Sequence, residues 1–208
     1  MPDPLRQESP LVGAIKPSRE RDAQPILAER PLRGFVNLRA DPSSETVVAA
    51  IVAALGVAPP RVNAFACKDD RYVIRLGPDE LLISVPPGEQ GTVEAWLAQG
   101  LAGQNHALTD VSSGYTMLRI SGGGARELIA TGCPLDLHPR SLPRGACAGT
   151  HIAKAEIVIL HGEADGEFQL IVRRSFAGYL WRWLADACDN DEYNGEIALT
   201  PLAGRGSG

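Results

Sequence analysis

Hydrophobic and polar positions follow a regular order in the first half of the chain. The stretch 34–40 alternates as a strand does, and 41–56 has the period of a helix that Asp41 or Ser43 would cap and Gly56 would end. Three short strands follow, separated by the turn signals "KDD" and "GPDE". A second helix, packed on the sheet of these strands, is predicted over 87–103, where these apolar positions recur at helical spacing: Val93, Trp96, Leu97 and Leu101.

The same order of elements recurs in the second half. The stretch 114–122 has the pattern of a strand, and 123–132 has the pattern of a helix. Two further strands and a closing helix, which Ser175 would cap, are predicted over 147–161, 166–174 and 175–189.

The two halves are also similar in sequence. Leu38-Arg39 aligns with Leu118-Arg119 at a spacing of 80 residues, which is too long for a solenoid repeat. The repeat predicts two related split β-α-β halves, each ferredoxin-like, packed about a pseudo-twofold axis. We therefore predict an α+β fold with two mostly antiparallel sheets and helices on their outer faces.

The ends of the chain differ in composition from its centre. Residues 1–30 are rich in proline and in charges of both signs, which predicts an extended N-terminal arm. A single domain is predicted over 31–200, with halves at about 34–110 and 114–200. Residues 201–208 are predicted to be a flexible tail.

Composition and charge narrow the classes of function. With 44% hydrophobic residues in 208, the chain can bury a substantial core. Its net charge of -5 disfavours binding to nucleic acid or to an anionic membrane. Neither a membrane-spanning apolar run nor a signal peptide is present in the sequence, which predicts a cytoplasmic protein. The cysteines form no Cys-x-x-Cys pair, so we expect reduced, structural thiols.

Several motifs that would indicate catalysis are incomplete. A dinucleotide-binding loop would need a third glycine, but the pattern Gly122, Gly124 ends in Glu127, whose carboxylate would repel a pyrophosphate. Ser112 and Ser113 lack the flanking glycines of a nucleophile elbow. The histidines show no metal-binding spacing. These motifs therefore favour a tight turn in a scaffold over a catalytic loop.

Two features favour contact with a partner protein. In the closing helix we predict that one apolar stripe packs in the core: Phe176, Tyr179, Leu180, Trp183 and Leu184. Trp181 lies outside this stripe, and tryptophan is one of the residue types that anchor protein interfaces. The long loop 132–147 carries Arg140 and Arg144, and is either a docking surface or a solvated connection. Trp181, Arg140 and Arg144 are the predicted interface residues.

Longer strings identify a resemblance to a known family. "LTDVSSGYTMLRISGGGARELIATGCPLDLHPR", "CAGTHIAKAEIVILH" and "FQLIVRRSFAGYLWRWLADA" resemble the gamma subunit of heterotetrameric sarcosine oxidase. The likeness is close over about 108–188 and extends loosely to about residue 30, with "SPL" and "LAERP" included. "SGGGA" departs from the Ser-Gly-Pro-Gly-Ala expected there, and the added glycine would loosen that turn.

The resemblance implies a fold, a reaction and partners. It implies a fold similar to the folate-binding domain of glycine-cleavage aminomethyltransferases. The whole oxidase would demethylate sarcosine with oxygen, giving glycine, hydrogen peroxide and 5,10-methylenetetrahydrofolate. Its alpha, beta and delta subunits would be the partners of this chain. FAD, FMN, NAD, zinc and tetrahydrofolate would be held by those other subunits, and this chain would serve assembly or stability without catalytic residues.

One segment tests the catalytic side of that resemblance. Aminomethyltransferases carry a Gly-Gly-x-x-Asp-Asp-Leu type segment on their catalytic strand, and the corresponding stretch here is 153–158. Its glycines are absent, and Ala155 and Glu156 replace the paired aspartates. This disfavours folate chemistry, although a free-standing protein for folate binding or aminomethyl transfer remains the alternative prediction.

Overall fold

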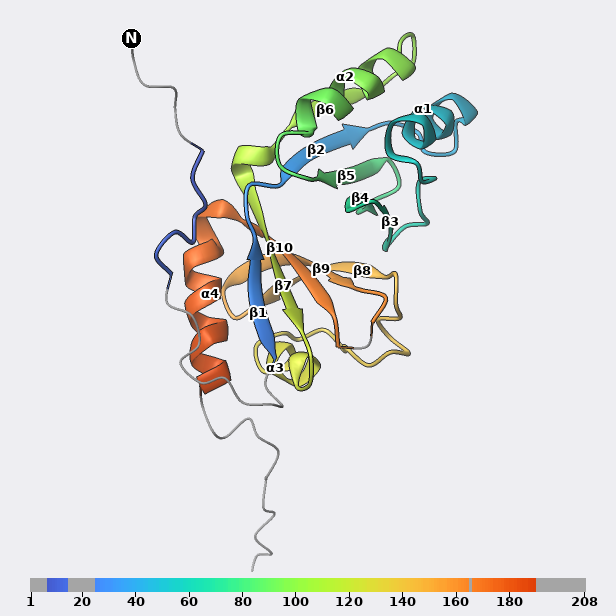
Figure 1. Cartoon of the computed structure of the whole chain (residues 1–208). Helices are drawn as coiled ribbons and strands as arrows, with labels where there is room; N and C mark the ends of the chain where they lie inside the picture. Colours follow the sequence, from blue (N-terminus) through green and yellow to red (C-terminus); the bar gives the residue numbers. More distant parts are fainter. Residues whose placement is uncertain (1–6, 15–24, 165, 190–208) are drawn as a thin grey trace, which may run out of the picture.

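The computed structural model describes residues 7–14, 25–164 and 166–189, which fold around two five-stranded antiparallel sheets (Figure 1). The first sheet has the order β3 (Ala64–Lys68), β4 (Arg71–Arg75), β5 (Glu80–Val85), β2 (Gly34–Arg39) and β6 (Ala107–Asp110). The second has the order β8 (Cys147–Ile152), β9 (Ala155–His161), β10 (Phe168–Arg173), β7 (Tyr115–Ser121) and β1 (Ile26–Arg30). The two orders are equivalent element by element, as the repeat in the sequence predicts.

The two halves exchange edge strands when each half is counted from its first strand, as residues 26–100 and 107–189, and not from 34 and 114 as the sequence suggested. β1 precedes β2 in the chain but pairs with β7, with Ala28 opposite Arg119. β6 precedes β7 but pairs with β2, with Leu108 opposite Leu38. Each half therefore supplies the edge strand of the sheet to which the other half contributes four strands.

Helices cover the outer face of each sheet, and the inner faces meet. α1 (Glu45–Leu55) and α2 (Gln90–Gly100) pack on the first sheet, and α3 (Ala125–Ala130) and α4 (Arg174–Asp189) pack on the second. The buried residues of the core between the sheets come from both halves: Phe35, Tyr72, Ile74, Leu82, Met117, Cys147, Leu160 and Ile171. The α+β prediction is confirmed.

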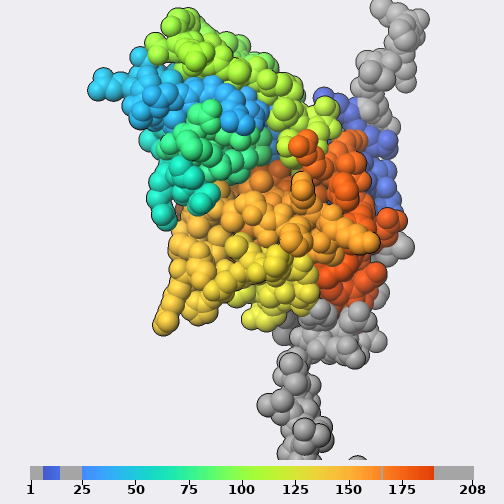
Figure 2. Space-filling view, turned by 180° about the vertical axis from the view of Figure 1, so that it is seen from behind, coloured from blue at the N-terminus to red at the C-terminus, as the bar shows by residue number. Residues whose placement is uncertain are grey.

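The sheets also touch at the edge opposite the exchanged strands. The Phe65 backbone N–H donates to the Gly145 carbonyl at 3.0 Å, and the Cys147 N–H donates to the Asn63 carbonyl at 3.0 Å. In the space-filling view, residues of the first half lie directly against residues of the second (Figure 2). The two halves thus form one continuous body.

Several element boundaries differ from those the sequence indicates. α1 ends at Gly56 as predicted, in the left-handed conformation with φ 72°, but it begins after Ser44. Asp41 instead accepts hydrogen bonds from the backbone and hydroxyl of Ser43, which holds a turn before the helix. The predicted strand 147–161 is a hairpin that turns at Ala153, whose φ is 49°.

The buried face of α4 is rotated from the predicted stripe. α4 begins at Arg174, so Ser175 lies inside the helix and is not its cap. The residues of α4 that are buried follow i, i+3, i+4 and i+7 spacing: Ala177, Leu180, Trp181, Leu184, Ala185, Ala187 and Cys188. Phe176 is 43% exposed, whereas Trp181 is only 6% exposed. The prediction that Trp181 lies outside the core is therefore wrong.

The described parts of the predicted N-terminal arm pack on the second half. β1 lies within that stretch and is a strand of the second sheet. Residues 7–14 lie near α4 in Figure 1, with Leu11 buried in the core beneath it. Ser9 accepts a hydrogen bond from the Leu11 N–H at 2.9 Å and donates one to Glu29 of β1. The rest of the predicted arm, and the tail 201–208, fall outside the described residues.

Leu11 provides a test of this packing. Replacing it with alanine removes a buried side chain, so Leu11→Ala should lower the free energy of unfolding by about 2 kcal/mol in urea denaturation. The neighbouring Val12→Ala is the matched control, because Val12 is 64% exposed and should change stability by less than about 0.5 kcal/mol. Equal effects of the two variants would show that residues 7–14 do not pack on the core.

Candidate functional site

The exchanged strands are joined to their own halves by two crossing linkers, 31–33 and 111–114. In the second linker, the Ser112 hydroxyl accepts a hydrogen bond from the Phe35 N–H at 2.9 Å and donates to Asp110 Oδ1 at 2.5 Å. The Val111 N–H donates to the Phe35 carbonyl at 2.8 Å. Ser112 thus holds one half against the other, which is a structural use of a hydroxyl that the sequence raised as a candidate nucleophile.

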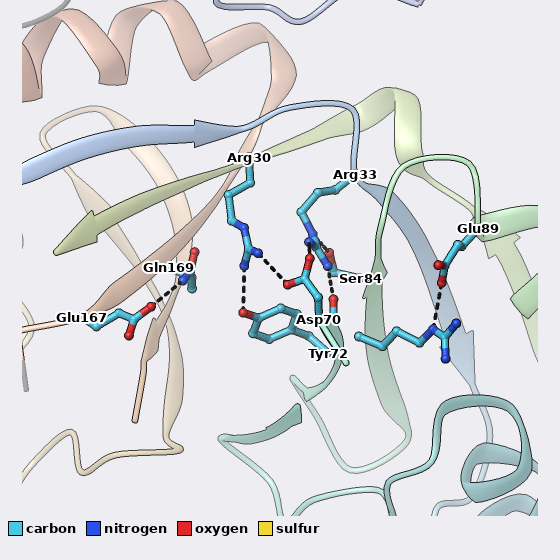
Figure 3. A network of polar contacts seen from close by, with 9 residues as sticks. Arg30, Arg33, Asp70, Tyr72, Ser84, Glu89, Glu167 and Gln169 are labelled. Atoms are coloured by element: carbon cyan, nitrogen blue, oxygen red, sulfur yellow. Dashed lines mark hydrogen bonds and ion pairs between the residues drawn. The ribbon is translucent and has the colours of Figure 1, made fainter. Parts of the chain in front are cut away.

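The first linker carries Arg33, which is the centre of a polar network between the sheets (Figure 3). Its side chain is 3% exposed and donates to Asp70 Oδ2 at 2.7 Å, to the Asp70 carbonyl at 2.6 Å and to the Ser84 hydroxyl at 2.8 Å. A guanidinium this deeply buried needs such partners, because an unpaired charge there would lose its hydration without compensation.

Arg30 completes the network from the end of β1. Its guanidinium donates to Asp70 Oδ1 at 2.6 Å and to the Tyr72 hydroxyl at 2.9 Å (Figure 3). Asp70 therefore joins an arginine of the second sheet to one on the linker into the first. The turn that presents it is tight, since Asp69 and Asp70 both have positive φ, 49° and 63°.

Burial and pairing shift the pKa values of two groups in the network, Arg30 and Tyr72. Burial lowers the pKa of Arg30, but the charges and hydrogen bonds of Tyr72 and Asp70 outweigh that effect and raise it above its ordinary value. Burial raises the pKa of the Tyr72 hydroxyl, with a smaller contribution from Cys67. The Tyr72 hydroxyl is therefore a neutral phenol at neutral pH, and it accepts from the Arg30 guanidinium that also binds Asp70, an arrangement suited to holding the halves together.

A cleft of about 390 Å³ lies where the linkers cross. Its walls mix both signs of charge with hydroxyl and amide groups: Gln7, Glu8, Pro10, Leu32, Arg33, Gln90, Asp110, Ser112, Ser113, Tyr115, Thr116 and Arg174. Arg33 already binds Asp70, and Arg174 donates to the Glu8 carbonyl. The Oε1 of Gln90 is buried without a hydrogen-bond partner among the described residues. The cleft could admit a small polar molecule, but much of its charge is already paired.

The thiols of the core are poorly suited to chemistry. Burial raises the pKa of Cys147 to about 12 and that of Cys188 to about 11. Both cysteines are therefore thiols at neutral pH, and the thiolate is the reactive form. Among the residues that the structure describes, no group of three or more His, Cys, Asp or Glu side chains could hold a metal ion. In the same residues no helix is long and apolar enough to cross a membrane.

The predicted interface residues lie apart. Arg140 and Arg144 are exposed on the loop after α3, and Trp181 is buried in the core beneath α4. The loop is ordered by Asp136, which accepts from the His138 N–H at 2.9 Å and from the Ser141 hydroxyl at 2.5 Å. Two of its leucines, Leu137 and Leu142, are buried in the core of the second half. An interface role for Arg140 and Arg144 stays a prediction.

The network of Arg30, Arg33 and Asp70 was not predicted from the sequence. "KDD" indicated only a turn, and the arginines are 37 and 40 residues away from the aspartate they bind. One signal was available in the sequence. Two arginines, Arg30 and Arg33, flank Pro31 at the start of the predicted domain, where charged side chains that form ion pairs with the domain would be expected.

Comparison with known proteins gives consistent matches. Residues 39–190 match the model of the "Sarcosine oxidase, gamma subunit family". The chain is 32% identical to a sarcosine oxidase subunit gamma of Arthrobacter sp. over 78% of this chain and 79% of that protein. It is 31% identical to the same subunit of Corynebacterium sp. strain P-1, over 81% and 79% of the two chains. These matches agree with the resemblance inferred from the sequence.

Solved structures give matches over most of the chain. A chain of the heterotetrameric sarcosine oxidase from Corynebacterium sp. U-96, in complex with pyrrole 2-carboxylate, matches with a TM-score of 0.79 and 26% identity, covering 91% of this chain and 97% of that one. Glycine cleavage system aminomethyltransferase T from Bartonella henselae matches with a TM-score of 0.60 and 16% identity, over 82% and 47% of the two chains. The second match shows a shared fold.

Loss of the Asp70 carboxylate should destabilise the whole chain. Asp70→Ala would leave the buried Arg33 charge without its partner, and we expect the free energy of unfolding to fall by about 3 kcal/mol in chemical denaturation. Asp79→Ala is the control, because Asp79 is 60% exposed in its ion pair with Arg39 and its removal should cost less than about 1 kcal/mol. A stability of Asp70→Ala equal to that of the control would contradict a joining role for the network.

Proposed function

The chain belongs to the sarcosine oxidase gamma subunit family, and on that premise we propose that it is an assembly and stabilising subunit which takes no part in the chemical step. The complex it serves would oxidatively demethylate sarcosine to glycine, with hydrogen peroxide and 5,10-methylenetetrahydrofolate as the other products. The observation that carries this proposal is the match to a chain of an assembled heterotetrameric oxidase over 97% of that chain. A likeness of that extent means that nearly the whole of that oxidase chain has its counterpart in this one.

The segment that corresponds to the aminomethyltransferase catalytic strand supports a non-catalytic role. Ala153 and Lys154 form the turn of the β8–β9 hairpin, and the chain continues in β9. Ala155 is fully buried, and Glu156 is exposed on the other face of the strand, opposite His151. Two neighbouring positions that face opposite sides cannot act as a carboxylate pair on one substrate.

We extend the proposal to cofactors and partners. The FAD, FMN, NAD, zinc and tetrahydrofolate of the complex would be bound by the alpha, beta and delta subunits. For zinc, the side chains of the described residues support this proposal, because no three or more of their His, Cys, Asp and Glu side chains are grouped so that they could hold a metal ion.

The alternative of a free-standing folate-binding protein is not favoured. The relatives that match along most of their length are subunits of sarcosine oxidase. The aminomethyltransferase match is 16% identical and concerns the fold alone.

Co-expression tests the assembly role. Without this chain, the other subunits should give a markedly lower yield of active, flavin-containing enzyme, because a surface that this chain covers would be left exposed. The measurement is flavin absorbance and oxygen uptake per milligram of purified enzyme, with and without the chain. An unchanged yield and activity in its absence would rule out the assembly role.

A conservative substitution tests the absence of a chemical role. Glu156→Gln removes the carboxylate nearest to the aminomethyltransferase catalytic position and should leave the turnover of the assembled oxidase unchanged. Glu127→Gln on α3 is the matched control, since Glu127 is also an exposed glutamate. If Glu156→Gln alone lowered turnover by about a hundredfold or more, Glu156 would be acting as a general acid or base, and the non-catalytic role would be wrong.

A further inference from the structure

The outward faces of α1 and α2 carry almost no charge. The ionisable side chains of the two helices are Glu45, in the first turn of α1, and Glu94, which is half-buried. The other exposed positions of the two helices are uncharged: Thr46, Ala49, Val52, Ala53, Gly91, Thr92, Ala95, Trp96, Ala98, Gln99 and Gly100. For a chain in which 22% of residues are charged, two solvent-facing helices of this composition are unusual.

Large apolar side chains stand on this face, which we call the α1–α2 face. Trp96 is 47% exposed and Val52 is 42% exposed. Trp96 was expected to lie in the core with Val93 and Leu97, which are both fully buried. Its exposure is a departure from the predicted helix stripe, and an exposed tryptophan among uncharged neighbours is typical of an interface anchor.

A shallow apolar groove of about 420 Å³ runs between the two helices. Most of the residues that line the groove are alanine or glycine, and the two larger side chains are those of Trp96 and Gln99. The lining residues are Ala50, Ala53, Ala54, Trp96, Gln99 and Gly100. The helices approach closely because Gly100 has no side chain, since a Cβ there would lie 2.8 Å from the Cβ of Ala50. The groove therefore has a floor of alanine and glycine and a tryptophan beside it, a shape that can receive an apolar side chain from another surface.

The exposed aromatic residue of α4 has a different setting. Phe176 is 43% exposed, which is close to the value for Trp96, but Arg174 and Arg173 lie two and three residues before it in the sequence. Charged side chains of this kind keep a surface hydrated. Phe176 is thus a matched control for Trp96, because it is an aromatic residue of similar exposure that lies near charged residues.

From these observations we propose that the α1–α2 face is where this chain docks on another subunit of the oxidase, and that the docked surface is uncharged and apolar. The proposal rests on the proposed function, which supplies the partner. The near absence of charge on the face indicates what kind of partner surface it binds. A charged partner surface would lose its hydration against this face and gain no opposite charge in return. The absence of Lys and Arg from both helices likewise disfavours nucleic acid and anionic lipid.

The position of the face in the fold suits such docking. α1 and α2 lie on the side of the first sheet that points away from the second half (Figure 1). They are backed by a core whose members Ile51, Val93, Leu97 and Leu101 are fully buried. The face is therefore presented on a rigid support, so little ordering of this chain would be needed on binding.

The test uses the full chain, affinity-tagged and co-expressed with the other oxidase subunits. Trp96→Glu places a charge on the face, and Val52→Glu does the same from the other helix. Both variants should keep the thermal midpoint of the wild-type chain, since both positions are exposed, and should retain at least about tenfold less of the other subunits on the tag. Phe176→Glu is the matched control and should retain them as the wild type does.

The possible results separate this inference from the proposed function. Retention of the other subunits by Trp96→Glu and Val52→Glu at the wild-type level would overturn the inference alone. So would a homodimer of the tagged chain in light scattering that Trp96→Glu dissociates, because the face would then bind a second copy. If even the wild-type chain retained no other subunit, the proposed function would fail and the inference with it. Loss of retention only in Arg140→Glu and Arg144→Glu would move the interface to the loop.

Discussion

The exchange of edge strands between the two halves is the constraint on which the rest of the structure depends. β1 and β6 each pair with a strand of the other half, so separating the halves would break two rows of backbone hydrogen bonds at once. The linker into β2 carries Arg33, whose buried guanidinium needs Asp70 from the β3–β4 turn. Strand pairing and charge pairing therefore act at the same crossing point. We infer that neither half is stable without the other, and that the chain unfolds as one unit.

This interlocked body explains how the polar groups of the chain are used. Ser112 fixes the crossing linker, Asp70 joins two arginines, and Tyr72 accepts from one of them. Groups of these types do chemistry in other proteins when they face a substrate, but here they are hydrogen-bonded to other groups of the chain. What the fold leaves available is surface, above all the uncharged helices on the first sheet. A rigid body with an apolar outer face is suited to hold other subunits in place.

The sequence was sufficient for the repeat and most of the elements, but not for their long-range partners. The periodicity of 34–40 and 114–122 identified β2 and β7, because alternation is a local property. The exchange of β1 and β6 could not be inferred, since local pattern carries no information on which strand lies alongside. β1 was hidden in a segment whose proline and charge content suggested an arm, although its Arg30 is part of the central network.

The errors in the helices have a common physical origin. In α4 the predicted stripe favoured large apolar residues, so Phe176 was preferred to its neighbour Ala177, and the face was rotated away from Trp181. Small residues allow close packing of a helix on a sheet and can define its buried face. In α2 the prediction placed Trp96 inside for the same reason. Size alone did not separate a buried residue from an exposed one in either helix.

The central claim is that this chain binds other oxidase subunits through the α1–α2 face, and radical footprinting of tryptophan tests it most directly. Oxidation of Trp96 would be measured by mass spectrometry in the isolated chain and in the assembled oxidase, with Phe176 as an internal reference. The account predicts that assembly strongly suppresses oxidation of Trp96 and leaves that of Phe176 unchanged. Equal oxidation of Trp96 in the isolated and assembled forms would contradict it.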